Sequence, residues 1–150
     1  MAYEIPILPN INGCIYKLWY LNKYIIVKCK TLFRSKENIE SGLKYFFKNT
    51  PKGRKETDYF HLFFVFVLDN PFNDFSIEII FESENPLELL KREFLEKQKA
   101  KSDENCLNNS FDVYVPKNTQ VNGKKSWINR GYYLNFMQWR LKYLNQNKIG

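Results

Sequence analysis

Few side chains in this sequence have the chemistry of a nucleophile or of a soft metal ligand. The chain of 150 residues contains three cysteines, Cys14, Cys29 and Cys106, and a single histidine, His61. The number of cysteines is odd and none belongs to a Cys-x-x-Cys pair, which argues for a reducing compartment and against a zinc site. Cys29 and Cys106 are therefore expected to be small apolar core residues. His61 is expected in the core or at its boundary.

Basic side chains, in contrast, are abundant enough to bind phosphate groups. Lys and Arg number 23 and Asp and Glu 16, so the formal net charge is +7. The excess is uneven: residues 1–70 carry 11 basic and 6 acidic side chains, residues 71–105 carry 5 and 9, and residues 106–150 carry 7 and 1. Such alternation suits a solvated surface, contacts between protein subunits, or a nucleic-acid groove with an acidic metal site. A DNA-binding module would place these side chains on phosphates: Lys28, Lys30, Arg34, Lys124, Lys125, Arg130 and Arg140.

The first half of the chain alternates strand and helix signals. Residues 13–28 are rich in Ile, Val, Tyr and Trp on both sides of Asn22-Lys23, which predicts a β-hairpin with its turn there. Apolar residues at helical spacing predict an amphipathic helix over 33–48. Residues 59–68 are apolar throughout, and good N-cap residues before them favour a buried helix. Alternation of polar and apolar residues over 75–81 predicts a third strand.

The second half is expected to contain two amphipathic helices. Asn85 as a cap and Pro86 at the first helical position predict where the first of them begins. Its apolar stripe would be formed by Leu87, Leu90 and Phe94, and its solvated side by Glu88, Lys91, Arg92, Glu96 and Lys97. Residues 101–131 are expected to be mostly loop, and residues 132–144 to form the last helix.

Together these signals predict an α+β fold. A small antiparallel sheet, made of the hairpin and a third strand, would be flanked by helices. Residues 1–110 would form the core and residues 111–150 a C-terminal extension with an amphipathic aromatic helix, in a single compact domain. No apolar run approaches the roughly 20 residues that a membrane span needs, so a soluble, intracellular protein with no membrane span is expected.

The hairpin and the helix after the third strand resemble the GIY-YIG nuclease family. The resemblance rests on Gly13-Cys14-Ile15-Tyr16-Lys17-Leu18, on Asn22-Lys23-Tyr24-Ile25-Ile26 and on Leu89-Leu90-Lys91-Arg92-Glu93-Phe94, and it covers about residues 11–110. The order of the expected elements agrees with it. It implies a GIY-YIG-like core and, in an active member, a Mg²⁺-dependent endonuclease that cleaves DNA.

The resemblance also implies roles for four residues. Tyr16 and Tyr24 would position or deprotonate the attacking water, Arg34 would hold the phosphate, and Glu93 would bind the metal ion. Plainer roles stay open for each of them. The tyrosines suit ordinary hairpin aromatics, Arg34 a solvated cation at a helix start, and Glu93 an ion pair with Lys97 four residues later.

The second motif departs from the family pattern. Ile26 stands where the family has a glycine, and a β-branched side chain would crowd the space where the backbone must approach substrate. Other registers of the motif lose the tyrosine as well. We therefore expect a preserved fold with a damaged site and no cofactor, with Mg²⁺ required only if the nuclease alternative holds.

The downstream part is similar to a small conserved protein of the crAss-like bacteriophages. The segments that carry this similarity are 105–109, 114–116, 126–128 and 134–136, together with Trp139. Those proteins carry a GIY-YIG-like core and are encoded near virion structural genes. The similarity therefore implies a place in the virus particle for a chain that is made in the cytoplasm of the bacterial host.

The leading hypothesis is a non-catalytic structural protein of a phage virion, in a ring of the tail or of the head-to-tail connector. Its partners would be portal, connector or tail ring subunits, in several copies, with possible DNA contact. The aromatic content of 17% exceeds what one small core holds and points to a partner surface. The expected interface residues are Trp19, Trp127, Tyr132, Tyr133, Phe136, Trp139 and Arg140. A GIY-YIG endonuclease and a DNA-binding module without cleavage are the alternatives.

Overall fold

The chain divides into two units, Met1–Asp112 and Val113–Gly150. A computed structural model describes residues 5–6, 8–32, 35–41, 60–71, 73–113, 120–121, 124–125 and 127–146. Within these ranges the side chains are described except over 120–133. Arg34 lies outside the described residues.

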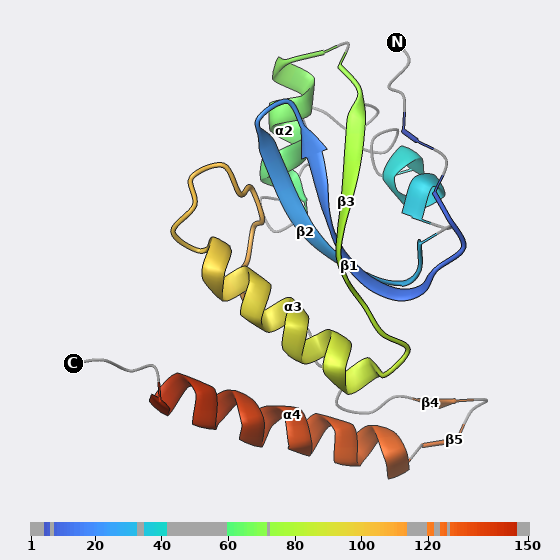
Figure 1. Ribbon diagram of the computed structural model, residues 1–150, viewed down its shortest axis with the longest axis vertical. Coiled ribbons are helices and arrows are strands. Elements are labelled where there is room, and N and C mark those ends of the chain that lie inside the picture. The colour runs from blue at the N-terminus through green and yellow to red at the C-terminus, as the bar shows by residue number, and fades with distance from the viewer. Residues whose placement is uncertain are drawn as a thin grey trace. The chain divides into compact units, whose positions relative to one another are not determined.

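A three-stranded antiparallel sheet forms the centre of the first unit (Figure 1). Strands β1 (Asn12–Tyr20) and β2 (Lys23–Thr31) form the hairpin, and β3 (Phe75–Glu82) pairs with the other edge of β1, so the strand order is β2-β1-β3. The predicted α+β class, with a hairpin plus a third strand, is confirmed.

The hairpin turn lies one residue earlier than the sequence predicted. Tyr20 pairs with Lys23, so the two-residue turn is Leu21-Asn22 and not Asn22-Lys23. Leu21 has a φ of 55°, in the left-handed region where side chains other than Gly and Asn are strained. The register places the apolar residues of both strands against the helices, and this burial outweighs the strain of one exposed turn residue.

Helices cover both faces of the sheet, and these faces carry different side chains. Successive residues of a strand point to opposite faces. One face, here the α2 face, carries Tyr16 and packs against the helical residues 35–41 and against α2 (His61–Asp69). The other, the α3 face, carries Ile26 and packs against α3 (Pro86–Ala100).

The signals for the start of α3 and the end of α2 are confirmed, but the start of α2 differs from the prediction. Its N-cap is Phe60, which forms no side-chain capping bond, and the predicted N-cap residues lie outside the described part. The helix that the apolar run 59–68 favoured is confirmed as α2, and Asn70 is its C-cap. Helix α3 begins at Pro86, and the Asn85 side chain accepts hydrogen bonds from the backbone N–H groups of Leu87 and Glu88.

One residue of α3 contradicts the prediction for its solvated side. Lys97 is buried, with 1% of its surface exposed. It lies one helical turn after Glu93, which is buried too, and seven residues after the buried Leu90. The stripe of α3 that faces the sheet therefore contains two opposite charges, which pair with each other.

The second unit contains a short hairpin and a long helix. Strands β4 (Gln120–Val121) and β5 (Lys124–Lys125) pair antiparallel, and α4 spans Trp127–Gln146, so it begins five residues before the predicted start at 132. The segment predicted as mostly loop, 101–131, thus includes both strands and the first turn of α4. Among the described residues no helix is long and apolar enough to cross a bilayer.

Candidate functional site

Tyr16, the first predicted catalytic residue, lies in the core on the α2 face. Its side chain is 1% exposed and its hydroxyl forms a hydrogen bond with the Ser35 side chain. Burial raises the pKa of Tyr16 well above its ordinary value of about 10, although the bond with Ser35 lowers it in part. Tyr16 therefore keeps its proton at neutral pH and is unsuited to deprotonate a water.

Tyr24 lies on the α3 face, in a polar cluster at the end of the hairpin. Its hydroxyl donates a hydrogen bond to Asp103 Oδ2 at 2.7 Å, and its ring lies 4.6 Å from that of Trp19. Lys17 Nζ lies 4.7 Å from the Tyr24 ring centroid, a cation–π contact. Burial and the bond to Asp103 raise the pKa of Tyr24, and the same bond is the main reason that the pKa of Asp103 is lowered. This tyrosine also stays protonated.

Glu93, the predicted metal ligand, is buried between two lysines. Its Oε2 lies 3.1 Å from Lys97 Nζ, and Lys97 also donates to the carbonyl oxygen of Asp112 at 3.3 Å. The other oxygen, Oε1, lies 3.9 Å from Lys28 Nζ and accepts no hydrogen bond from the described part of the chain. A divalent cation would have to displace both ammonium groups to reach this carboxylate.

Of the four residues of the predicted nuclease site, the three that the structure describes are thus not gathered at one point. Tyr16 and Tyr24 lie on opposite faces of the sheet, and Glu93 shares only the face of Tyr24. Arg34 falls outside the described residues. Within the described ranges, no three His, Cys, Asp or Glu side chains lie close enough together to hold a metal ion.

The glycine position of the second motif is filled by a core side chain. Ile26 is fully buried on the α3 face and packs in a cluster with Leu89 and Ala100. Its backbone N–H donates to Asn108 Oδ1 at 2.8 Å, and Asn108 Nδ2 donates to its carbonyl oxygen at 3.1 Å. The outer edge of β2 is therefore closed at Ile26 by the loop after α3.

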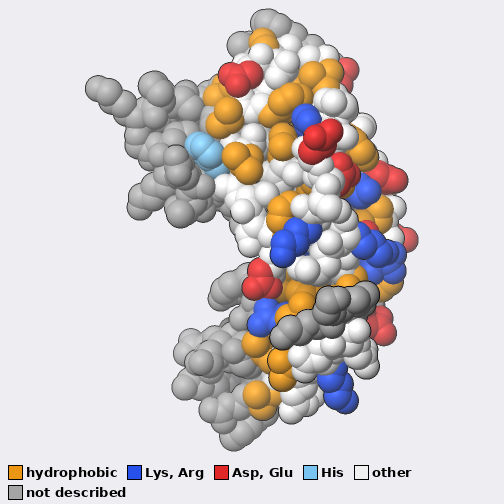
Figure 2. Space-filling view, turned by 90° about the vertical axis from the view of Figure 1, so that its left-hand side faces the viewer, with side chains coloured by type: hydrophobic (Ala, Val, Ile, Leu, Met, Phe, Trp, Pro, Cys, Tyr) orange, Lys and Arg blue, Asp and Glu red, His pale blue; other side chains and the backbone are white. Residues whose placement is uncertain are grey.

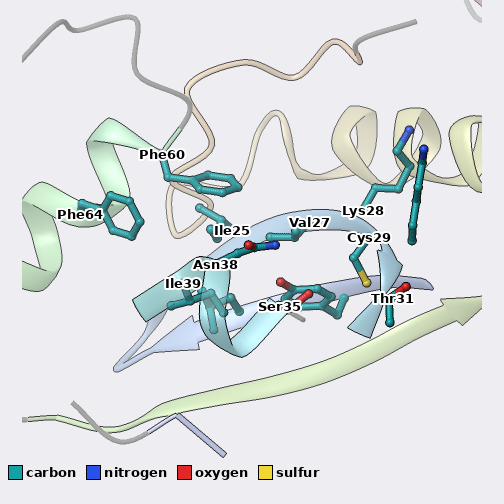
Figure 3. Close-up of a pocket in the computed structure, with 13 residues that line it drawn as sticks. Ile25, Val27, Lys28, Cys29, Thr31, Ser35, Asn38, Ile39, Phe60 and Phe64 are labelled. Carbon is teal, nitrogen blue, oxygen red and sulfur yellow. The ribbon is translucent and has the colours of Figure 1, made fainter. Parts of the chain in front are cut away.

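The cavity beside the hairpin lies on the opposite, α2 face (Figure 3). It has a volume of about 530 Å³ between β2, the helical residues 35–41 and the start of α2. Apolar side chains such as Val27 and Phe60 line much of it, but Cys29, Ser35 and Asn38 supply polar groups. Cys29 and Ser35 were not among the predicted site residues, although Cys14 and Cys29 stand at matching distances from the hairpin turn.

The predicted interface residues are distributed over both units. Trp19 is half-buried, and its Nε1 donates to Glu78 Oε1 at 3.1 Å. In α4, Trp139 lies 5.8 Å from both Phe136 and Tyr143, measured between ring centroids, and the Arg140 guanidinium lies 5.7 Å from the Phe136 ring. The following predicted interface residues have side chains outside the described part: Trp127, Tyr132 and Tyr133.

The predicted DNA-contacting residues do not form a continuous basic surface where side chains are described. Lys30 is exposed, but Lys28 is 30% exposed and faces Glu93. Figure 2 shows Lys and Arg side chains interspersed with acidic and hydrophobic ones on the face it displays. The side chains of Lys124, Lys125 and Arg130 lie beyond the described part.

Comparisons with family models, with curated proteins and with solved structures found no match for this chain.

Proposed function

We propose that this chain is a non-catalytic structural protein of a bacteriophage virion, a ring component of the tail or of the head-to-tail connector. The observation that carries the proposal is the separation of the nuclease residues. Two protonated tyrosines lie on opposite faces of the sheet, and the carboxylate that would bind Mg²⁺ is paired with Lys97. A chain with the order of elements that the resemblance implies, but with these reactive groups apart, is better suited to packing than to cleavage.

The GIY-YIG-like scaffold in this proposal is supported by the order of the elements. The described chain runs strand, strand, helical residues 35–41, α2, β3, α3, which is the order that the resemblance implies. This support is topological, and topology alone carries no activity.

The partner surface in this proposal is the exposed side of α4. Leu134, Leu141 and Leu144 are 53%, 61% and 45% exposed, and Trp139 and Arg140 are half-buried beside them. Exposed apolar surface beside a tryptophan and an arginine suits a protein–protein contact, because these two residue types are enriched at such interfaces. The partners of this surface would be portal, connector or tail ring subunits.

The test is mass spectrometry of purified virions from the phage that encodes the chain. We expect its peptides in intact particles. Their amount relative to peptides of the portal subunit should correspond to several copies of the chain per particle. The full-length protein alone, or with neighbouring ring proteins, should sediment as a multimer. Absence of the peptides from purified particles would refute the structural role.

The rival activity is tested with the same preparation. Supercoiled plasmid incubated with the protein and Mg²⁺ should remain uncut, both for the wild type and for Tyr24→Phe. Cleavage by the wild type that is lost in Tyr24→Phe, a variant that keeps the ring, would replace this proposal with a nuclease. Slower migration of the DNA in a gel, lost as the salt concentration rises, would instead indicate a DNA-binding module.

A further inference from the structure

Two of the three cysteines meet across the hairpin. Cys14 of β1 and Cys29 of β2 are directly opposite in the strand register, and their Sγ atoms lie 3.2 Å apart. Both thiols are free. A disulfide requires about 2.05 Å between the sulfurs, so the bond needs a small rotation of two side chains that already face each other.

The two thiols differ in access. Cys14 is fully buried, whereas Cys29 is half-buried and lines the 530 Å³ cavity on the α2 face. In Figure 3 Cys29 lies on β2 near Ser35 and Thr31, with Asn38 projecting from the helical residues above the strand. A small reagent in this cavity would therefore meet Cys29 first, with hydroxyl and amide groups around it.

The hydrogen bonds also differ between the two thiols. The Cys14 and Cys29 thiols share a hydrogen bond and Cys29 forms another with Ser35, and these bonds lower the pKa of Cys29 to about 7. The same bond to Cys29, together with burial, raises the pKa of Cys14. Ser35 in turn contacts the Tyr16 hydroxyl, which extends the network into the core. The thiolate therefore forms more readily at Cys29 than at Cys14.

We propose that Cys14 and Cys29 form a reversible peroxide-reactive dithiol site, in which Cys29 attacks the oxidant from the cavity and Cys14 resolves the product. The Cys29 thiolate attacks one oxygen of hydrogen peroxide, the O–O bond breaks, and hydroxide leaves and takes a proton to become water. Cys29 is then a sulfenic acid. The Cys14 sulfur attacks the Cys29 sulfur, its proton leaves with the sulfenic hydroxyl as a second water, and the disulfide forms. The two thiols are oxidised by two electrons, and the peroxide is reduced.

The rate follows from the thiolate population. Because its pKa is lowered, Cys29 has a larger thiolate fraction at neutral pH than an ordinary cysteine. The lower basicity also reduces its intrinsic nucleophilicity, but by less than the thiolate fraction increases, so Cys29 is expected to react faster than an ordinary cysteine. Cys106 is a matched comparison in the same chain, because it is buried and burial raises its pKa.

The experiment uses the reduced full-length protein with hydrogen peroxide as the probe, followed by thiol counting and non-reducing peptide mapping. We expect the loss of two thiols, a Cys14–Cys29 linkage within one chain, and recovery with dithiothreitol. Cys29→Ser should abolish the fast loss. Cys14→Ser should lose one thiol and give a sulfenic acid that dimedone traps, and Cys106→Ser should behave as the wild type.

Three results would overturn the proposal. Reaction of Cys106 as fast as Cys29 would show that the cavity gives no selectivity. Cross-linking between chains instead of within one would show that Cys14 does not resolve the intermediate. Persistence of all three thiols in the folded wild type at peroxide levels that oxidise free cysteine would show that Cys29 is not reachable, and this measurement needs no variant.

Discussion

Replacing Glu93 by glutamine tests whether its carboxylate stabilises the fold or is a metal ligand. Lys97 is 1% exposed and Glu93 4% exposed by side chain, so the substitution leaves a buried ammonium without its anion. Removing one partner of a buried ion pair costs about 3–5 kcal/mol. Lys97 retains its bond to the Asp112 carbonyl oxygen, which places Glu93→Gln at the lower end. We expect a loss of about 3 kcal/mol in the free energy of unfolding and a fall of roughly 10 °C in Tm.

The matched control removes both charges together. Glu93→Leu with Lys97→Met replaces the pair by apolar side chains of similar length, and such exchanges are often neutral or stabilising. Lys28 loses its partner in this variant, but it is 30% exposed and can be solvated. We expect a stability within about 1 kcal/mol of the wild type. Urea unfolding followed by circular dichroism measures all three proteins, and equal m values show that only stability has changed.

A metal-binding role predicts the opposite pattern. If Glu93 were a metal ligand, Glu93→Gln would leave the metal-free protein about as stable as the wild type, and Mg²⁺ would raise the Tm of the wild type alone. That combination would refute the ion-pair argument. It would also remove the main support for a non-catalytic role.

Three further predictions concern single groups in the first unit. Gly13→Ala should cost about 3 kcal/mol, because Gly13 has a φ of 83° and an added Cβ would overlap the Ser83 carbonyl oxygen. A lower Tm, or failure to obtain soluble folded protein, would confirm this prediction. Asn108→Leu should cost about 3 kcal/mol in urea unfolding, because it leaves two backbone groups of the β2 edge without partners, and an unchanged midpoint would contradict this. The free energy of unfolding should fall above about pH 10, because the pKa values of Tyr16 and Tyr24 are raised in the folded protein. The resulting stabilisation is complete below the pKa of an unfolded tyrosine and is lost as the pH rises toward the pKa in the folded protein. A urea midpoint that stays level between about pH 9 and pH 11 would exclude it.

The sequence predicted those elements whose signals are local. The helix start at Asn85-Pro86 depends on two neighbouring residues, and the stop after α2 on the residues that directly follow it. The burial of Lys97 was also visible in principle, because it lies seven residues after Leu90 on the same stripe. The ion pair with Glu93, one of the two roles that the sequence left open for that carboxylate, is what makes the burial of this charge acceptable.

The parts that sequence reasoning missed depend on distant residues. Asn108 closes the β2 edge at Ile26, which lies 82 residues earlier, and no local sequence pattern predicts such a contact. The thiol pair was missed because the turn was predicted one residue too late. With the turn at Asn22-Lys23, Cys14 would stand opposite a residue two positions beyond Cys29, and the correct turn brings the two cysteines level.

Loop length alone decides which hairpin residues can share a site. In a hairpin with a two-residue turn, the numbers of two paired residues add up to an odd number, as those of Tyr16 and Val27 do. Paired residues point to the same face of the sheet. Each face therefore carries the even-numbered residues of one strand and the odd-numbered residues of the other. Tyr16 and Tyr24 are both even and therefore face opposite ways, whichever of the two candidate turns is used. A tyrosine at 25 or 27 would have faced Tyr16, but those positions hold Ile and Val. Cys14 and Cys29 satisfy the same rule, so the hairpin that separates the tyrosines brings the two thiols together.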